Sequence, residues 1–538
     1  MAGMMKMAAG MGLVLVAAAG AASAQWSANP LLNTLVSGGS GDQGVPLVGA
    51  RPDGGAWVSF FSNTGSGYRP MVQRLDVGGH TMLPGSGLVL ANRRNSATFI
   101  YDMKVDRSGN AIIAFDDDSS GTTVVTVQMV AADGSLPWGA AGRQMAGTSG
   151  VLAPHIATCA DGTIVVGWAN SNVLNFQRLD VNGAAVGAAW TVTEAGHYQA
   201  ITDMQATGPS GGTGGEFIAM WVRGETTSSI TSRKGLKIQK WNGSNAAVWS
   251  GAGGAGTAID IYSSAVGKSI QNGYFPAIAS DFSGGAIVAW YDNGNTRNAW
   301  LQHVQANGTM RFPAEGLGMT TNGSASEYRL SASVDRNEST GEYTVAWQRS
   351  NTLQSQFGLN AQRVSPAGGL LWGAQGATVV PMGGFQSSFI QAFDGDAGAA
   401  YLMWIQYTGT TTQEIQAAKL DSAGNLAWPT PITRMATRIS GKGRLSAVGS
   451  ETRNMAIAVW ADGSSGDADI LAQNIGGDGL LGPICASDFN FDRVVDFFDY
   501  LDFVAAFSDQ SEGADFNHDG VIDFFDYLDF VDVFSTGC

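Results

Sequence analysis

Charged residues are scarce in this chain of 538 residues, at 14% against about 25% in an average soluble domain. Only 29 are Lys or Arg, and the net charge is −16, which argues against a phosphate-binding surface for nucleic acid. Three cysteines are too few for a disulfide scaffold. Five scattered histidines, with no pair at ligand spacing, give no support for a zinc site. At 44% apolar residues, the chain can nevertheless bury a sizeable core.

The N-terminus predicts a secretory signal peptide over residues 1–24. Lys6 supplies positive charge, Met11–Gly20 the short apolar run, and Ala22–Ala24 a small-residue cleavage site before Gln25. The apolar run is too short to span a bilayer comfortably, and no other segment is long and apolar enough to do so. We therefore expect a secreted, extracellular or cell-surface protein without a transmembrane segment in its mature chain.

Residues 25–482 repeat with a period of about 57 residues. The first marker is a glycine followed six residues later by Trp or Phe. Its copies are Gly54/Phe60, Gly109/Phe115, Gly162/Trp168, Gly215/Trp221, Gly284/Trp290, Gly341/Trp347, Gly398/Trp404 and, with Asn for Gly, Asn454/Trp460. The second marker is Gln followed six residues later by Gly, as in Gln73/Gly79. One copy is shortened (Gln239/Gly243), and another has Ala418 for Gln.

Short apolar runs and turn residues between the markers predict four strands per repeat. Eight repeats without a helical pattern predict a mainly β body, an eight-bladed β-propeller, with seven blades or a solenoid as alternatives. The eighth repeat ends near Gly479 without a fourth strand, while Leu31–Val36, which follows Trp26, resembles that strand. Supplying it from the N-terminus would pair the last exposed edge and close the ring. A linear solenoid would instead need polar caps, which the sequence does not show.

Nothing in the body marks a reacting centre. Cys159 stands alone beside a turn, which favours a buried thiol over a nucleophile. The repeated Trp residues are expected in the core between blades. Acidic residues follow some of the marker strands, and solvated hairpin charges are their default interpretation: Asp116, Asp117, Asp118, Asp292, Asp462, Asp467 and Asp469. A glycosidase would need two carboxylates about 5–10 Å apart across a cleft, and the sequence brings no two of these together.

The C-terminal tail, from residue 488 onward, has a net charge of −12, whereas the whole chain has −16. Two copies of one pattern begin at Asp488 and Asp515. In each copy, oxygen-bearing side chains occupy positions 1, 3, 5, 9 and 12, with a backbone carbonyl at position 7, which is the spacing of a twelve-residue Ca²⁺ loop. The predicted ligands of two Ca²⁺ ions are Asp488, Asn490, Asp492, Val494, Asp496 and Asp499, then Asp515, Asn517, Asp519, Val521, Asp523 and Asp526.

The two loops differ at position 6, where the backbone must turn sharply. Gly520 suits that turn in the second loop, whereas Arg493 places a side chain and a positive charge in the first. We therefore expect the first site to be the weaker one. Cys485 and Cys538 bracket the tail and are the candidates for a disulfide.

Each loop is followed by a segment of helical length, Phe497–Phe507 and Phe524–Phe534. Apolar residues recur in them at helical spacing: Phe497, Leu501, Val504 and Phe507, then Phe524, Leu528, Val531 and Phe534. Without metal the crowded carboxylates repel one another, so we expect Ca²⁺ binding and folding of the tail to be coupled.

The paired DxNxDxxxDxxD loops resemble the duplicated calcium motifs of dockerin domains. The terminal STGC (Ser535–Cys538) and the FFDYLDF helices are similar to the GC-type dockerin-like tails of secreted planctomycete proteins. The resemblance covers residues 485–538. It implies docking to a cohesin-like or other surface scaffold, often in polysaccharide breakdown. Phe497-Phe498 and Phe524-Phe525 stand where dockerins often carry small polar recognition residues, so the partner can differ from a standard cohesin; at least one Phe of each pair is expected in the core.

Three functions fit this organisation. The chain can be a secreted binding or structural propeller tethered through its tail, with a polysaccharide as a further partner. It can be a glycan-active hydrolase or lyase carried on the same tail, or an extracellular adhesion protein. The first is preferred, because the body shows no catalytic motif.

Overall fold

A computed structural model of the chain describes residues 26–536. Its gaps are 64, 66, 91–99, 119–120, 146–152, 208–213, 294–297, 322–326, 396–397, 451–454, 465, 483–486, 491–493, 512–513 and 517–520. The predicted signal peptide (1–24), Cys485, Asp492, Arg493, Asn517, Asp519, Gly520 and Cys538 lie outside the described residues. No helix among the described residues is long and apolar enough to cross a membrane.

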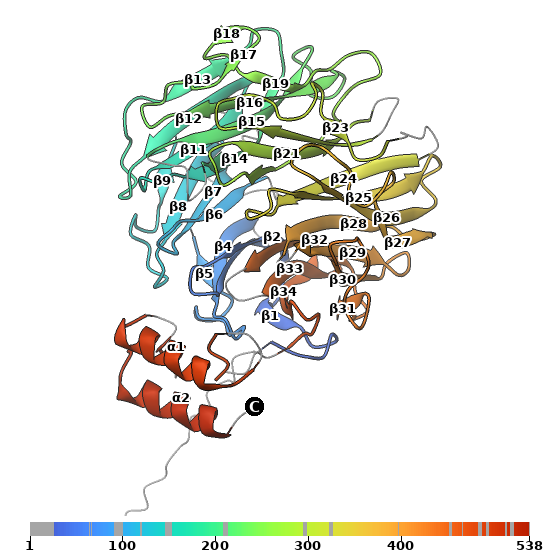
Figure 1. The fold of residues 1–538 in the computed structure, drawn as a ribbon. Helices are drawn as coiled ribbons and strands as arrows, with labels where there is room; N and C mark the ends of the chain where they lie inside the picture. The colour runs from blue at the N-terminus through green and yellow to red at the C-terminus, as the bar shows by residue number, and fades with distance from the viewer. Residues whose placement is uncertain are drawn as a thin grey trace, which may run out of the picture.

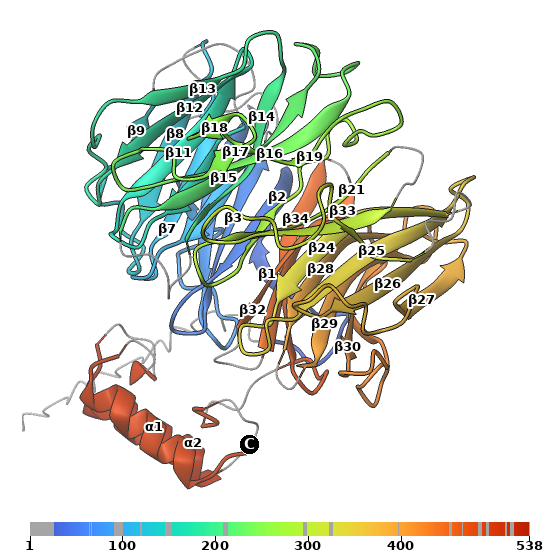
Figure 2. The same ribbon diagram turned by 45° about the horizontal axis from the view of Figure 1, so that its top comes forward.

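Eight four-stranded antiparallel sheets form the body, which confirms the eight-bladed β-propeller (Figures 1 and 2). Blade one comprises β2 (Asp42–Ala50), β3 (Ala56–Asn63), β4 (Tyr68–Leu75) and β5 (Leu88–Val89). Blade two comprises β6 (Asp102–Val105), β7 (Ala111–Asp117), β8 (Val124–Val130) and β9 (Arg143–Gln144). Blade three comprises β10 (His155–Thr158), β11 (Ile164–Asn170), β12 (Val173–Leu179) and β13 (Trp190–Thr193). Blade four comprises β14 (Gln199–Ala206), β15 (Phe217–Gly224), β16 (Lys234–Trp241) and β19 (Ile259–Tyr262). Blade five comprises β20 (Ile278–Ser280), β21 (Ala286–Tyr291), β22 (Ala299–Val304) and β23 (Leu317–Gly318). The longer fourth repeat adds a small hairpin, β17 (Ser250–Gly251) and β18 (Gly254–Ala255).

Blade six comprises β24 (Glu327–Arg336), β25 (Tyr343–Asn351), β26 (Phe357–Val364) and β27 (Ala377–Gly383). Blade seven comprises β28 (Ser387–Asp394), β29 (Ala400–Tyr407), β30 (Gln413–Leu420) and β31 (Thr433–Ala436). Blade eight comprises β32 (Lys442–Ser450), β33 (Met455–Ser464), β34 (Asp467–Gly476) and the N-terminal strand β1 (Thr34–Ser37). The first strands of neighbouring blades contact one another, as β2 does with β32 and β24 with β28, so these strands form the inner wall of the ring.

The ring closes through the N-terminus, as the incomplete eighth repeat predicted. Strand β1 pairs antiparallel with β34, and Thr34 lies opposite Ala472 (Figure 1). Trp26 completes the closure, because its side chain is buried and its indole Nε1 donates to the Val77 carbonyl of blade one at 2.7 Å. The last outer edge of the propeller is therefore covered by a strand from the other end of the chain.

The Gln marker holds the connection between the third and fourth strands of a blade. The Gln73 carboxamide accepts from the Leu83 amide at 2.9 Å and donates to the Leu83 carbonyl at 3.0 Å. Gln239 makes the same pair of bonds with Trp249. In blade eight, Gln473 donates instead to Ser27 of the N-terminal segment. The marker thus satisfies backbone groups of a connection that crosses the blade interior.

The glycine of the second marker is required by both conformation and contact. Gly79 has a φ of +85°, and a Cβ there would lie 2.5 Å from the Trp26 ring. Gly479 repeats this geometry, with φ +84° and a Cβ 2.6 Å from Trp428. An aromatic side chain of one blade therefore rests on the hairpin turn of the next. The marker Trp and Phe residues themselves are at most 3% exposed, which confirms their place in the core.

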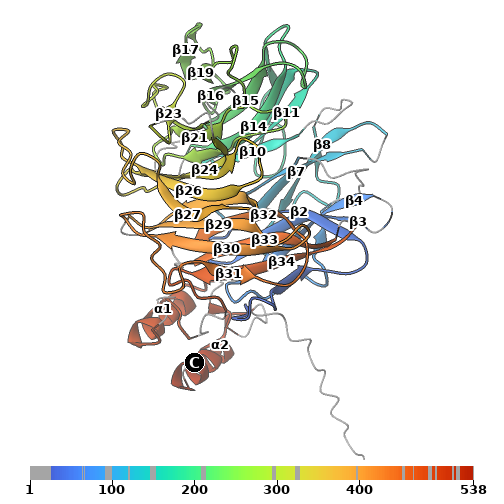
Figure 3. The ribbon, with the colours of Figure 1, turned by 90° about the vertical axis from the view of Figure 1, so that its right-hand side faces the viewer.

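The tail forms two helices, α1 (Phe497–Ser508) and α2 (Phe524–Thr536), which lie side by side outside the ring of sheets (Figures 1 and 3). Phe503 and Phe530 stack between them, with ring centroids 3.9 Å apart, and both are fully buried. The hydroxyls of Tyr500 and Tyr527 lie 3.1 Å apart. The members of each pair are 27 residues apart in the chain, so the duplicated sequence packs as a near-symmetric pair.

Candidate functional site

The last carboxylate of each predicted calcium loop is buried and ties its loop to its helix. Asp499 accepts from the Asn490 amide at 3.0 Å and from the Asp496 amide at 2.8 Å. Asp526 likewise accepts from the Phe516 amide at 2.7 Å and the Asp523 amide at 2.8 Å. In both loops, the carboxylate at position 12 therefore accepts from one backbone amide near the start of the loop and from the amide at position 9.

The acids at position 9 cap the helices. Asp496 accepts from the Phe498 amide at 2.8 Å and forms a capping box with Asp499. Asp523 accepts from the Phe525 amide at the same distance. These acids thus fix the helix starts in addition to any role toward a metal.

The described members of the two predicted loops offer oxygen atoms, the type of ligand that Ca²⁺ prefers. Asp488 is buried, whereas Val494 and Val521, the predicted carbonyl donors, have exposed side chains. The described members of the predicted set are Asp488, Asn490, Val494, Asp496 and Asp499 in the first loop, and Asp515, Val521, Asp523 and Asp526 in the second.

The expectation that at least one Phe of each pair is core is wrong. Phe497 and Phe498 are 64% and 65% exposed, and Phe524 and Phe525 are 63% and 64% exposed. Leu501 and Leu528, which the helical spacing also placed on the apolar stripe, are half-exposed at 45%. The core is instead formed around Phe503 and Phe530, because the two helices pack through that side.

The expectation of solvated hairpin charges is wrong for four of the acidic residues that follow the marker strands, because these four are buried. Asp116, Asp117, Asp292 and Asp462 are at most 1% exposed. Asp292 accepts from the Tyr262 hydroxyl at 2.9 Å, and Asp462 lies 3.2 Å from the Lys442 ammonium. They belong to blades two, five and eight.

Four charged or titratable groups from three blades meet on the inner wall. The Lys104 Nζ lies 3.1 Å from Asp203 and 3.6 Å from Asp102, and His155 Nδ1 lies 3.9 Å from Asp102. Burial lowers the pKa of His155, and the two carboxylates oppose this only in part. Burial would also lower the pKa of Lys104, but Asp102 and Asp203 outweigh it and raise that pKa. Asp102, His155 and Asp203 have the spacing of a metal site, yet Lys104 already supplies the positive charge.

Sequence reasoning missed this cluster. Asp102 also accepts from the Ile156 amide of blade three, and Asp203 accepts from the Ile278 amide of blade five, each at 2.9 Å. The two aspartates hold the same place in their repeats and connect neighbouring inner strands. The signal in the sequence is the aspartate at the same position of two repeats, Asp102 and Asp203. Aligning the repeats on their inner strands could have revealed it, whereas a search for His pairs could not.

Two other reactive side chains, Cys159 and His303, have structural roles. Cys159 is buried, and burial raises the pKa of its thiol to about 11, as expected for a lone structural thiol. His303 is buried with Nε2 3.0 Å from Asp281 and Nδ1 2.6 Å from the Tyr343 hydroxyl. Burial would raise the pKa of Asp281, but hydrogen bonds from His303 and from the Ser283 and Gly285 amides hold it below its usual value.

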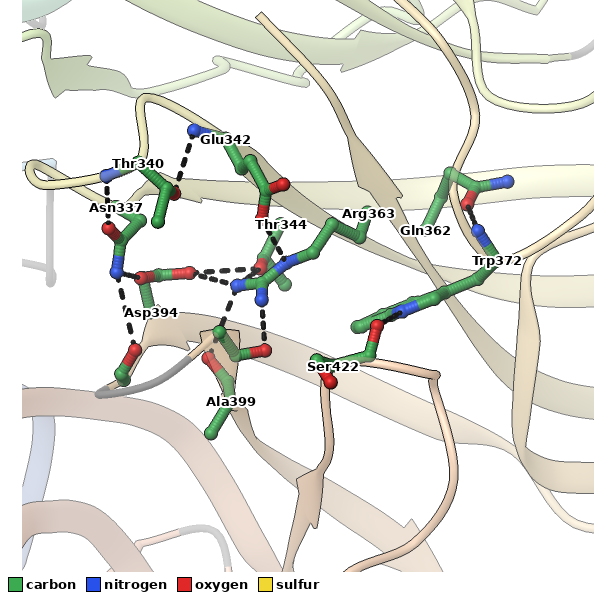
Figure 4. Close-up of polar contacts among 12 residues, drawn as sticks. Asn337, Thr340, Glu342, Thr344, Gln362, Arg363, Trp372, Asp394, Ala399 and Ser422 are labelled. Carbon is green, nitrogen blue, oxygen red and sulfur yellow. Dashed lines mark hydrogen bonds and ion pairs between the residues drawn. The ribbon is translucent and has the colours of Figure 1, made fainter.

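An ion pair fills the interface between blades six and seven (Figure 4). The buried Arg363 guanidinium bonds Asp394 and the Gly398 carbonyl, and its Nε lies 3.6 Å from Glu342. Asn337 also donates to Asp394. Burial raises the pKa of Asp394 even though these groups donate to its carboxylate.

A cavity of about 360 Å³ lies beside this network, between blades seven and eight. Its walls are mostly apolar and include Phe393, Tyr401, Met403, Trp428, Met455 and Ile475. Asn337, Glu338 and Ser339, from the β24–β25 turn, supply polar groups at one side. This volume lies in the range of small-molecule sites, about 300–1,000 Å³.

No protein-family model matches the chain, and no curated protein matches it. Many solved structures are similar to it at low sequence identity, and three of them are described next. The BP39L lectin from Burkholderia pseudomallei is 16% identical, with a TM-score of 0.44, and the match covers 72% of this chain and 97% of the lectin. The polysaccharide lyase Uly1 is 10% identical, with a TM-score of 0.40 over 74% of this chain and 92% of the lyase. The Dos1 propeller is 9% identical, with a TM-score of 0.43 over 83% and 95% of the two chains.

Proposed function

We propose that this protein is a secreted binding propeller, held at a scaffold or cell surface by its C-terminal helical tail in a calcium-dependent manner. The tail would dock like a dockerin onto a cohesin-like or other surface protein. The propeller would present a binding surface, with a polysaccharide-degrading setting as its context. Signal-peptide-directed export over residues 1–24 belongs to the same proposal.

The observation that carries this proposal is the exposed apolar face of the tail. Six large apolar side chains, three from each helix, are between 45% and 65% exposed in a module of about fifty residues: Phe497, Phe498, Leu501, Phe524, Phe525 and Leu528. Single exposed apolar residues are ordinary, but such a duplicated set next to two loops supports contact with a partner. The duplication offers the partner two equivalent anchors 27 residues apart in the chain.

The loops would hold Ca²⁺ through the predicted ligands named above, whose carboxylates and carbonyls suit a hard cation. The ion, when bound, supplies the positive charge that offsets repulsion among these acids. Asp499 and Asp526 connect each loop to the first turn of its helix. When the loop is ordered, the first turn and its exposed Phe pair are therefore held in place as well. Docking is therefore expected to need calcium although the Phe side chains touch no ion.

Calcium binding is tested by titration calorimetry on the full chain. We expect two ions per chain, and loss of binding in the double variant Asp499→Asn/Asp526→Asn. The control is Asp502→Asn/Asp529→Asn, which removes the same charge from exposed positions on the same helices. Absence of calcium uptake by the unaltered chain, or equal loss in both double variants, would contradict the proposal.

Docking is tested by retention of the purified chain on the envelope fraction of its producing cells. Retention should require calcium and fall at least tenfold in Phe498→Ser/Phe525→Ser. The control is Val266→Ser/Leu353→Ser, which removes apolar side chains that are 88% and 83% exposed on the propeller. Retention that survives a chelator, or that depends on the propeller residues instead, would overturn the tethering role.

A further inference from the structure

Two connections that leave strands of blade four are longer than their equivalents elsewhere in the propeller. Residues 225–233 join β15 to β16, and these nine residues compare with two to seven between the second and third described strands of the other blades. Residues 263–277 join β19 to β20 of blade five, and these fifteen compare with three to twelve before the first described strand of the other blades. A connection of about 12–15 residues is uncommon in a compact domain unless it serves a function.

Backbone hydrogen bonds hold the connection 263–277 against blades four and five. The Ile270 amide donates to the Lys234 carbonyl at 2.9 Å, and the Asn293 amide donates to the Ser269 carbonyl at 3.0 Å. The Lys234 amide in turn donates to the Ser269 hydroxyl at 3.1 Å. The two long connections are therefore fixed to each other and to the β21–β22 turn.

Together these segments enclose a pocket of about 310 Å³, which lies in the range of small-molecule sites. Three of its lining residues are cations and none of the described ones is acidic, although the net charge of the chain is −16. Hydroxyl and amide side chains from both connections and from the β21–β22 turn complete the polar lining. The cations are Arg233, Lys234 and Lys268.

Two of the three cations are already paired with an acid outside the lining. The Arg233 guanidinium lies 2.6 Å from Glu225, and the Lys268 Nζ lies 3.4 Å from Glu315. Both cationic side chains are 46% exposed, so these pairs are surface interactions. They leave Lys234 as the cation of the pocket that forms no ion pair with a described residue.

Lys234 is buried with incomplete compensation of its charge. It is 3% exposed, and its Nζ donates to the Ser232 carbonyl at 3.2 Å and lies 5.8 Å from the centre of the Tyr198 ring. Burial lowers the pKa of Lys234, and no carboxylate raises it. An ammonium has three N–H groups to donate, and burying a charge without a partner is costly. An anion beside Lys234 would supply both the charge and the acceptors.

We infer that this pocket binds an acidic sugar, a hexuronate of a polysaccharide, whose carboxylate pairs with Lys234. The sugar hydroxyls would bond with the side chains of Asn272 and Asn293, which line the pocket and form no hydrogen bond with described residues. Ile230, which is 74% exposed, offers an apolar contact to the C–H groups of the sugar ring. The inference rests on the proposed binding role of the propeller and names its ligand class, but it does not depend on calcium or on the tail.

The charge preference is tested with three sugars that differ at C6, glucuronate, glucuronamide and 6-amino-6-deoxyglucose, by ligand-observed NMR on the full chain. Glucuronate should bind at least tenfold more tightly than the neutral amide, and the amine least tightly. Acetate should bind at least tenfold more weakly than glucuronate, because it lacks the ring and its hydroxyls. Equal affinity for glucuronate and the amide, equal affinity for acetate, or no binding of any sugar would overturn the inference.

The role of the ammonium is tested with Lys234→Met, in which the affinity for glucuronate should fall to that of the amide. The matched control is Lys237→Met on the same strand, where the Nζ lies near Glu194 and Asp260 instead. It should bind glucuronate like the unaltered chain. Glucuronate binding that survives in Lys234→Met, or that is lost equally in both variants, would show that Lys234 does not hold the carboxylate.

The location is tested without altering a buried residue by Asn272→Asp/Asn293→Asp, which keeps the side-chain shapes and adds two negative charges to the pocket. The affinity for glucuronate should fall at least tenfold, and that for the amide much less. The control, Asn182→Asp/Gln354→Glu, adds the same charge at exposed positions of blades three and six. Equal loss in both double variants would place the ligand elsewhere.

The same variants separate this inference from the tethering proposal. Asn272→Asp/Asn293→Asp should keep calcium-dependent retention on the envelope fraction, and Phe498→Ser/Phe525→Ser should keep glucuronate binding. If the Phe variant loses glucuronate binding, the sugar site lies in the tail and the pocket is wrongly assigned. If no sugar probe binds while retention persists, the ligand class fails and the tethering stands.

Discussion

Replacing Trp26 by alanine should loosen the propeller at the seam between blades eight and one. Trp26 is 1% exposed, its indole donates to Val77, and its ring covers Gly79. Truncating a buried aromatic residue to alanine costs about 3–5 kcal/mol in other proteins. Against a typical domain stability of about 5–15 kcal/mol, that is a large fraction. Strand β1 keeps its pairing with β34 and the bonds of Ser27 and Asn33 with Gln473, so this loss should loosen β1 on β34 without detaching it.

Trp138 provides the matched control for this effect. It is also buried, and its indole donates to the Val181 carbonyl of the next blade at 3.0 Å. Trp138→Ala should lower the free energy of unfolding by a similar amount, because the contacts are equivalent. It should leave the seam unchanged, however, since Trp138 lies between blades two and three.

The two variants are distinguished by urea unfolding combined with amide hydrogen exchange. Both should unfold at lower urea, but only Trp26→Ala should speed exchange of the amides in β1 and β34. Unchanged protection of β1 in Trp26→Ala would refute the idea that Trp26 holds the seam. Loss of protection there in Trp138→Ala would show that the ring opens as a whole.

Three further predictions concern the inner-wall cluster, the buried Asp281 and the buried Cys159. Lys104→Met should cost about 3–5 kcal/mol of unfolding free energy in urea, because Asp102 and Asp203 lose their counter-charge, and adding Asp203→Asn should recover part of it. The pKa of Asp281 is lowered in the folded state from the unfolded value of 3.8, so its contribution to stability is present above that value and lost as pH falls below it. The midpoint temperature of thermal unfolding should therefore fall as the pH is lowered below about 4. It should fall less steeply with pH in Asp281→Asn. Cys159 should resist a thiol reagent at pH 8 until the chain is unfolded, as peptide mapping by mass spectrometry would show.

The propeller was predictable because the repeat markers record contacts between blades. Gln73 bonds the connection before the fourth strand, and Gly79 accommodates the aromatic side chain of the preceding blade. Such contacts recur in most blades, so their residues recur in the sequence. The seam was predictable for the same reason, because the eighth repeat lacked one strand and the N-terminus carried an unassigned one.

The packing of the tail was not predictable from helical spacing. The FFDYLDFV segments carry apolar residues on several faces of each helix, so periodicity alone does not select the buried side. Phe503 and Phe530 became the core, whereas Phe497 and Leu501, on the expected stripe, remain exposed. The capping aspartates Asp496 and Asp523 fix where each helix begins, but a helix start does not select the buried side.

The inner-wall cluster escaped prediction for a different reason. Its members come from three repeats, and each is ordinary in its own repeat. Only the closure of the ring brings Lys104 of blade two within 3.1 Å of Asp203 in blade four. Sequence spacing carries no information on that distance until the inner strands are placed side by side.

The departures from the repeat pattern carry the most information about a site. The seventh repeat has Ala418 where the other repeats have Gln, and the eighth has Asn454 where the others have the marker glycine. Both departures fall in the two blades that enclose the cavity of about 360 Å³. The register adds no further departure at this interface, because Asp394 is itself the exception. The equivalent residues of the other blades are Ala50, Val105, Thr158, Ala206, Ser280, Arg336 and Gly449. A departure is therefore informative only when it is compared with all eight repeats, since comparison with one neighbouring blade does not show that a contact was lost.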